Sequence, residues 1–331
     1  MDKKKPFTKN IVRLENVQSV VDQIVEKLRE DVIHKLKRFG GVVGISGGID
    51  SSVCLALAAK AFGPEKVVTL MMPEKDSNPE SEILARELAE KFEVKSLFLE
   101  NITSVLEGFG CYERRDEAVQ RIFPDYNPLT HKMKIGIKQR GLFNNLPPVF
   151  SLTVLDQNGN EKELPLNVKD YLQIVAASNF KQRTRMAMLY YYAEVYYYSV
   201  IGTPNKHETE QGFFVKYGDG GADVMPIGNL YKTQVYQLAE YLGIPEGIIS
   251  RIPTTDTYPA EQTQEEFFYQ LPFDLMDLYW YGFENEYSGN EVASIMGETT
   301  ERVEAIFRNF ARKRKTTEYL KLSPIRDYFH G

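Results

Sequence analysis

The sequence predicts an α/β fold in which a doubly wound parallel sheet is the middle of three layers. Short apolar runs of strand length alternate with longer segments of helical spacing, which is typical of a parallel sheet covered on both faces. A polar glycine loop also follows the first apolar run, as expected where a parallel strand passes into a helix. Of the 331 residues, 43% are hydrophobic, so the chain can bury a large core. We therefore expect one domain over residues 1–331, with an insertion at about 108–165.

The first third of the chain supplies alternating strands and helices. Residues 17–36 place valine, isoleucine and leucine at spacings of three and four, which predicts a long amphipathic helix. The elements expected after it are strands at 41–45, 66–72 and 94–99, and helices at 53–62 and 80–92.

Residues 108–165 interrupt this alternation. They carry several prolines, and two runs with strand character flank residues 156–160 (DQNGN), whose Asn-Gly pair is typical of a hairpin turn. We expect an insertion that contains a hairpin but is too short to own a large core. The pattern then resumes with a helix at 168–194, a strand at 196–201, and helices at 232–242, 266–284, 288–296 and 300–315.

Composition excludes several classes of protein. The formal net charge is -6 and the pI about 5.5, whereas nucleic-acid binding needs an excess of positive charge. Cys54 and Cys111 form neither a CxxC pair nor part of a zinc-spaced cluster, which argues against a disulfide scaffold and favours a reducing cytoplasm. The polar start and the lack of an apolar run of about 18 residues predict neither a signal peptide nor a membrane helix.

The glycine loop at residues 46–52 (SGGIDSS) carries the main chemical signal. It lies between a strand and a helix, at the edge of a parallel sheet where ligands bind. Glycines let the backbone approach an anion closely, and the helix start favours phosphate. The Gly-Lys-Ser/Thr ending of a Walker A loop is absent, so another kind of phosphate loop is indicated.

SGGIDSS resembles the pyrophosphate loop of the Rossmann-like ATP pyrophosphatase families, which cleave ATP to AMP and pyrophosphate. Three later segments are similar to those of ammonia-dependent NAD synthetases: residues 179–186 (NFKQRTRM), 202–208 (GTPNKHE) and 212–234 (GFFVKYGDGGADVMPIGNLYKTQ). The resemblance covers about residues 15–107 and 168–320. It implies ATP-dependent amidation of deamido-NAD by ammonia through an acyl-adenylate.

The resemblance also implies roles for single residues. Asp50, Asp219 and Lys232 match positions at the reacting centre. ATP would contact Gly44, Ile45, Ser46, Gly47, Gly48, Ile49, Asp50, Ser51, Ser52, Thr203, Lys232 and Thr254. Deamido-NAD would contact Asn179, Arg183, Lys216, Asp223, Arg312 and Lys313.

Asp50 and Glu208 match the family's magnesium positions. Magnesium takes hard oxygen ligands and would neutralise the departing pyrophosphate. Two simpler interpretations stay open: Asp50 as a helix N-cap and Glu208 as a surface carboxylate. The basic run at 312–314 is equally typical of a helix C-terminus.

The identity of the carboxylate substrate is the least determined part of this prediction. Pro204, Arg312 and the insertion depart from the family pattern, mostly on the deamido-NAD side. The alternatives are a related ligase acting on another carboxylate and a non-catalytic nucleotide-binding module. The family further implies a homodimer that uses free ammonia, with a separate glutaminase subunit left open.

Overall fold

The computed structural model describes residues 4–138, 149–254 and 257–326, so part of the expected insertion (139–148) lies outside the described residues. Its main sheet has four parallel strands in the order β3-β2-β1-β7. The strands are β1 (Gly41–Gly44), β2 (Val67–Met71), β3 (Ser96–Leu99) and β7 (Ser199–Ile201). The chain moves outward from β1 to β3 and then crosses back to β7, which confirms the doubly wound order. Its switch point lies between β1 and β7, where parallel sheets open a crevice.

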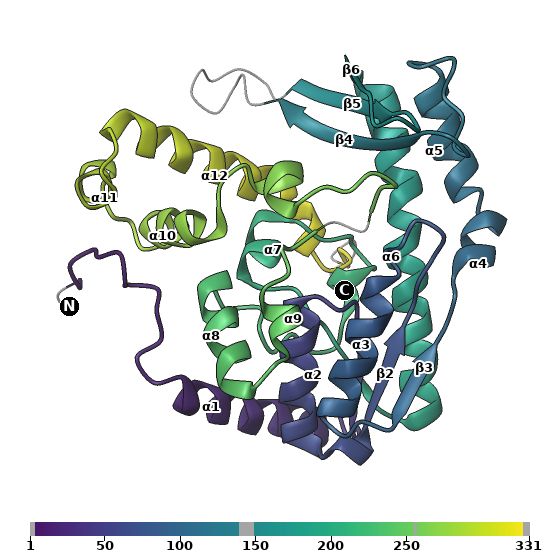
Figure 1. Cartoon of the computed structure of the whole chain (residues 1–331). Coiled ribbons are helices and arrows are strands. Elements are labelled where there is room, and N and C mark those ends of the chain that lie inside the picture. The colour runs from purple at the N-terminus through teal and green to yellow at the C-terminus, as the bar shows by residue number, and fades with distance from the viewer. Residues whose placement is uncertain (1–3, 139–148, 255–256, 327–331) are drawn as a thin grey trace.

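Helices cover both faces of this sheet (Figure 1). Val43 and Val67 are buried on one face, and their neighbours Val42 and Val68 on the other. Successive residues of a strand point to opposite faces of the sheet. Because both faces are buried, the strand sequences are continuous apolar runs. On the first face lie α1 (Val17–Arg29), α2 (Ile49–Phe62) and α8 (Lys232–Leu242), and on the second α4 (Thr103–Gly108), α5 (Cys111–Gln120) and α6 (Val168–Tyr196).

A small antiparallel sheet lies at one end of α6 (Figure 1). Its strands are β4 (Lys132–Lys138), β5 (Val149–Leu155) and β6 (Glu161–Pro165). The β5–β6 hairpin turns at residues 156–160, as the Asn-Gly signal predicts. The core beneath it is small and is completed from outside the insertion, because Met133 and Leu152 pack with Ile174 of α6.

The C-terminal helices form a separate lobe around the fully buried Trp280. They are α10 (Phe273–Glu284), α11 (Gly289–Met296) and α12 (Thr300–Lys321). Phe7 and Val12 of the N-terminal segment join this core, and Figure 1 shows that segment running past the ends of α10 and α11.

The remaining elements are α3 (Glu80–Lys91), α7 (Lys206–Gln211), α9 (Glu246–Ile249), 3₁₀ turns at Pro64–Lys66 and Asp219–Gly221, and π-helical segments at Glu30–Lys35 and Glu265–Tyr269. Two sequence predictions need correction. The helix expected at 266–284 is broken, since Gln270 adopts a φ of 64° and Pro272 precedes the new start at Phe273. The helix expected from residue 53 begins at Ile49, directly on the glycine loop.

Candidate active site

A cavity of about 760 Å³ opens at the carboxyl ends of β1, β2 and β7. That volume is ample for a nucleotide and part of a second substrate. Its walls come from the glycine loop, the loop after β2, the middle of α6, the turn after β7 and residues 251–254 and 257–258. The cavity therefore lies at the predicted edge of the sheet.

The glycine loop requires glycine at Gly47 for two reasons. Its φ is 70°, and a Cβ atom there would lie 2.9 Å from the Ser81 carbonyl oxygen and 3.2 Å from the Leu84 Cβ. Gly48, which has an extended φ of -94°, occupies the N-cap position of α2. The loop is thus pressed against the start of α3, and the amide end of α2 points toward the cavity side.

The predicted loop residues divide between the cavity and the loop's own structure. Gly44, Ile45, Ser46, Gly48, Ile49, Asp50 and Ser51 line the cavity. Ser52 is fully buried and its hydroxyl donates to the Gly48 carbonyl over 2.9 Å. Ser51 donates to the same oxygen over 3.0 Å. Gly47 and Ser52 therefore shape the loop from outside the cavity lining.

Asp50 and Lys232 meet across 182 positions of sequence. The Lys232 Nζ lies 2.5 Å from Asp50 Oδ2, and the Asn205 side-chain amide donates to Asp50 Oδ1 over 3.3 Å. Burial alone would lower the pKa of Lys232, but the carboxylates of Asp50 and Glu208 outweigh it and raise that pKa. Asp50 lies in the first turn of α2, after the N-cap, so its side chain serves this cluster and not the helix cap.

Glu208 joins the same cluster through α7. One of its oxygens accepts the Asn205 backbone N–H over 2.8 Å in a capping box, and the side chain lines the cavity. Burial, with the neighbouring Asp50 carboxylate second, raises the pKa of Glu208 to about 8. Burial disfavours the charged form of Glu208, and the Asp50 carboxylate adds repulsion that the Lys232 charge does not fully offset.

These two carboxylates fit a magnesium ion. Among the described residues, no group of three or more Asp, Glu, His or Cys side chains is arranged to hold a metal ion by itself. Magnesium is ordinarily held by one or two carboxylates together with substrate phosphates. Asp50 and Glu208, beside a phosphate loop, offer that donor set.

Asp219 also lines the cavity, as do Asn179, Thr203 and Thr254. Its Oδ1 accepts the Val215 backbone N–H over 2.8 Å. Burial raises the pKa of Asp219 to about 6. This carboxyl group can therefore exchange a proton near neutral pH.

The remaining predicted substrate residues lie outside the cavity lining. Arg183 is exposed and donates to the Lys216 carbonyl over 3.3 Å, while the Lys216 ammonium donates to the carbonyls of Tyr319 and Leu322 over 2.9 and 2.8 Å. Asp223 accepts the Tyr190 hydroxyl and a backbone amide of β7.

The basic run on α12 also lies outside the cavity lining. Arg312 is exposed, whereas the Lys313 ammonium donates to the Phe268 carbonyl over 2.9 Å. Burial, together with the Arg312 charge, lowers the pKa of Lys313 to about 7. Within this chain, Asn179 is the predicted deamido-NAD contact that the cavity includes.

Sequence reasoning missed several residues that support the site. Asp277 of α10 accepts the backbone amides of Lys232 and Thr233 over 3.3 and 2.7 Å, and its Oδ1 lies 2.5 Å from His207 Nε2. It therefore caps α8 where Lys232 begins it. The available signal was His207 beside Glu208; nothing local pointed to Asp277.

Glu74 and Lys181 also line the cavity, although neither was predicted as a site residue. Glu74 follows β2 as the glycine loop follows β1, so its position at a strand's carboxyl end was a usable signal. Lys181 lies inside the NFKQRTRM segment, in which Asn179 and Arg183 were predicted as substrate contacts and Lys181 was not.

The fold and cavity define an α/β nucleotide-binding protein whose phosphate loop and acidic cluster share one crevice. A family model described as NAD synthase matches residues 20–121 and 154–318. The chain belongs to the NAD synthase family. The stretch between the two matched parts falls within the predicted insertion.

Relatives match almost the whole chain. An NH(3)-dependent NAD(+) synthetase from Mesorhizobium japonicum is 46% identical over 94% of this chain and 96% of its own length. One from Rhizobium meliloti is 48% identical over 92% and 90%, and one from Methanocaldococcus jannaschii is 32% identical over 80% of each chain.

Two solved structures share the fold. An NMN synthetase from Francisella tularensis has a TM-score of 0.63 at 22% identity, and the NH3-dependent NAD synthetase from Campylobacter jejuni has 0.61 at 21%. Each alignment covers 95% of this chain and 99% of the other. At these identities the likeness concerns the fold alone.

Proposed function

We propose that this chain is an ammonia-dependent NAD⁺ synthetase, a ligase that amidates deamido-NAD at the expense of ATP. One observation supports this most directly: the glycine loop, Asp50 and Glu208 line a single cavity, and the buried Lys232, outside that lining, pairs with Asp50. A phosphate loop next to a cation and two carboxylates suits chemistry at the α-phosphate of ATP.

The reaction has two steps. A carboxylate oxygen of deamido-NAD bonds to the α-phosphorus of ATP while the bond to pyrophosphate breaks, which leaves an acyl-adenylate. The ammonia nitrogen then bonds to the acyl carbon, the bond to AMP breaks, and the nitrogen gives up one proton. The protein needs no covalent nucleophile, because positioning and electrostatic stabilisation suffice for both displacements.

We assign roles to the residues from their placement. The loop amides around Ser46 would hold the phosphates that depart, and the Lys232 ammonium, paired with Asp50 behind the lining, would supply positive charge there. Asp50 and Glu208 would hold magnesium, which when bound supplies positive charge against the departing pyrophosphate. Asp219 lines the cavity and its pKa is raised to about 6 by burial, so it would accept the ammonia proton.

An assay of the purified chain tests this function. With ATP, magnesium, ammonium and deamido-NAD, we expect NAD, AMP and pyrophosphate in equal amounts, and Asp50→Asn should reduce the rate by about 100-fold or more. Release of ADP and phosphate, or no turnover with deamido-NAD, would reject the proposal. Comparing ammonium with glutamine decides whether a separate glutaminase must deliver the nitrogen.

A related ligase acting on another carboxylate is the second candidate. The observation in its favour is that Arg183, Lys216 and Asp223 lie outside the cavity lining. A panel of nicotinate-containing carboxylates in the same assay separates the two. Turnover with another acid, and not with deamido-NAD, selects the second.

We further propose a homodimer in a reducing cytoplasm. Val168, Leu172, Tyr191 and Val195 expose apolar surface along α6, which suits a contact between copies. Both Cys54 and Cys111 are free and buried. Among the described residues, no helix is both long enough and apolar enough to cross a bilayer. Light scattering of the eluted protein measures the oligomeric state.

A further inference from the structure

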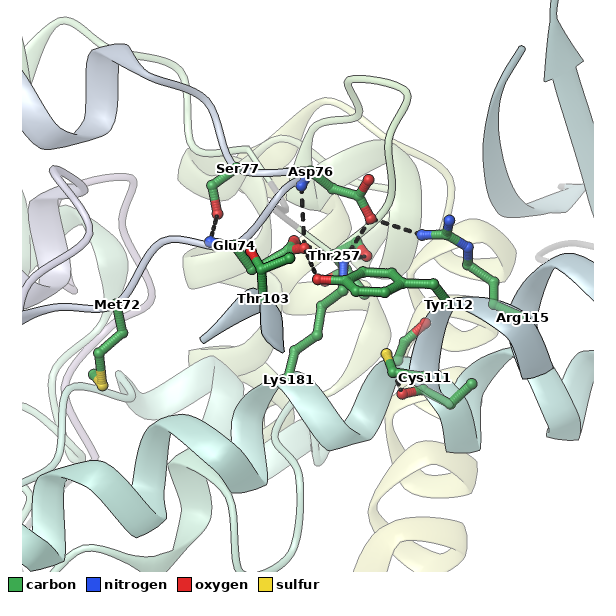
Figure 2. A network of polar contacts seen from close by, with 12 residues as sticks. Met72, Glu74, Asp76, Ser77, Thr103, Cys111, Tyr112, Arg115, Lys181 and Thr257 are labelled. Atoms are coloured by element: carbon green, nitrogen blue, oxygen red, sulfur yellow. Dashed lines mark hydrogen bonds and ion pairs between the residues drawn. The ribbon is translucent and has the colours of Figure 1, made fainter. Parts of the chain in front are cut away.

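Figure 2 shows a buried network of charged side chains, two of which, Glu74 and Lys181, also line the cavity. Glu74 and Asp76 come from the loop after β2, Lys181 from the middle of α6, and Tyr112 and Arg115 from α5. The Lys181 side chain is 2% exposed and that of Glu74 is 0% exposed. Charges this deeply buried are retained only when each has partners.

Lys181 uses its whole hydrogen-bonding capacity inside this network. Its Nζ donates to Glu74 Oε1 over 2.8 Å, to Asp76 Oδ2 over 3.0 Å and to the Thr257 carbonyl over 3.0 Å. An ammonium group has three donors, so all three are matched. Although Lys181 borders the cavity, it could bind a substrate anion only by giving up one of these bonds.

Helix α5 holds the same two carboxylates from the other side. The Tyr112 hydroxyl donates to Glu74 Oε2 over 2.7 Å, and Arg115 Nη1 donates to Asp76 Oδ2 over 2.7 Å. Burial alone would raise the pKa of Asp76, but Lys181 and Arg115 outweigh it and lower that pKa. The carboxylate is therefore ionised and held between two cations.

The two loops that Lys181 joins both form the nucleotide side of the cavity. The loop after β2 leads to Ser81, whose carbonyl lies against Gly47 of the glycine loop. Thr257 lies three positions after Thr254, a predicted ATP contact, and both residues line the cavity. One ammonium group thus connects α6 with two separate parts of the wall.

We propose that Lys181 is a positioning residue that fixes the nucleotide wall of the cavity, with α5 as its support. The proposal rests on the proposed function only in taking ATP as the nucleotide. It gives α5, at the start of the segment 108–165, a function in the site: it buttresses the loop after β2. The inference concerns binding geometry, so it is measured without catalysis.

Three variants test it. Tyr112→Phe removes one hydrogen bond to Glu74 and leaves every charge in place. The double variant Lys181→Met, Glu74→Gln removes one charge of each sign, so it leaves the Arg115–Asp76 pair intact. Tyr192→Phe is the matched control, because Tyr192 also donates to a glutamate, Glu100, but neither residue lines the cavity.

The measured quantity is the dissociation constant of a non-cleavable ATP analogue, which has a methylene group between its α- and β-phosphorus atoms. Isothermal titration calorimetry in the presence of magnesium gives this constant. We expect Tyr112→Phe to weaken binding roughly threefold and the double variant about tenfold or more. Tyr192→Phe should bind as the wild type does. In turnover, the KM for ATP should rise with little change in the KM for deamido-NAD.

Equal binding by wild type and Tyr112→Phe would overturn the inference, whether or not the double variant folds. Equal weakening by Tyr192→Phe would overturn it too, because the effect would then be general loosening. A wild-type chain that binds the analogue but forms no NAD rejects the proposed function, while the inference about Lys181 is judged on binding alone.

Discussion

Replacing Lys232 by methionine should cost both stability and activity. The ammonium is fully buried, whereas the side chain of its partner Asp50 is 17% exposed. Removing one partner of a buried pair costs about 3–5 kcal/mol, because the other charge is left uncompensated. The partial exposure of Asp50 lets water replace some of the lost interaction, so we expect a loss at the low end, about 3 kcal/mol.

Activity should fall further than stability. Loss of one preorganised group that stabilises transition-state charge reduces kcat by about 100- to 1000-fold. Urea unfolding measures the free energy of unfolding, and steady-state production of AMP measures kcat. Lys206→Met is the matched control, because Lys206 pairs with Glu284 over 2.8 Å away from the cavity lining. The Lys206 and Glu284 side chains are 14% and 29% exposed, so that variant should lose less stability than Lys232→Met, and it should keep its kcat.

A double variant separates the electrostatic explanation from simple loss of packing. In Lys232→Met, Asp50→Asn both charges of the pair are gone, so most of the lost stability should return while activity stays absent. The reasoning is refuted if the single variant unfolds with wild-type free energy. It is equally refuted if the double variant is less stable than the single one.

Three further predictions concern the glycine loop, α12 and α8. Gly47→Ala should lose roughly 1–2 kcal/mol of stability because of its φ of 70°, and more because the new methyl group contacts Ser81; it should also weaken ATP binding. Gly243→Ala is the control, because its φ is 73° but its surroundings are open, so it should lose only the conformational part. Urea unfolding compares the two variants. Because burial lowers the pKa of Lys313 from 10.5 to about 7, the unfolded chain holds more protons between these values. Stability should therefore rise with pH across that window in the wild type and not in Lys313→Met. Asp277→Ala removes the acceptor at the start of α8 and leaves the buried His207 without its carboxylate partner. We expect the free energy of unfolding to fall by about 2–4 kcal/mol and the KM for ATP to rise. An unchanged KM would contradict the positioning role of Asp277.

The fold was predictable because its signals are local. Apolar runs mark the strands. The loop at 46–52 is recognisable from its composition, because a glycine at positive φ and the start of a helix depend on neighbouring residues alone. The helix break near Gln270 also had a local signal, Pro272, but the apolar spacing on both sides favoured one continuous helix. There the proline signal outweighed periodicity.

The supporting contacts of the site were not predictable in this way. Lys181 and Glu74 are 107 positions apart, and His207 and Asp277 are 70 apart. Which side chains meet depends on how helices pack across the sheet, and no single segment carries that information. The loop predicted where phosphate would bind, while the residues that hold the loop in place came from the tertiary structure.

Helix α6 runs for 29 residues and packs into two different cores, through Ile174 near its start and through Met186 and Leu189 nearer its end. Lys181 lies between them. Inserting or deleting one residue in this stretch would rotate one core by about 100° about the helix axis relative to the other. The stretch can therefore vary in side chains far more readily than in length, since its phase sets which face of the helix meets the cavity.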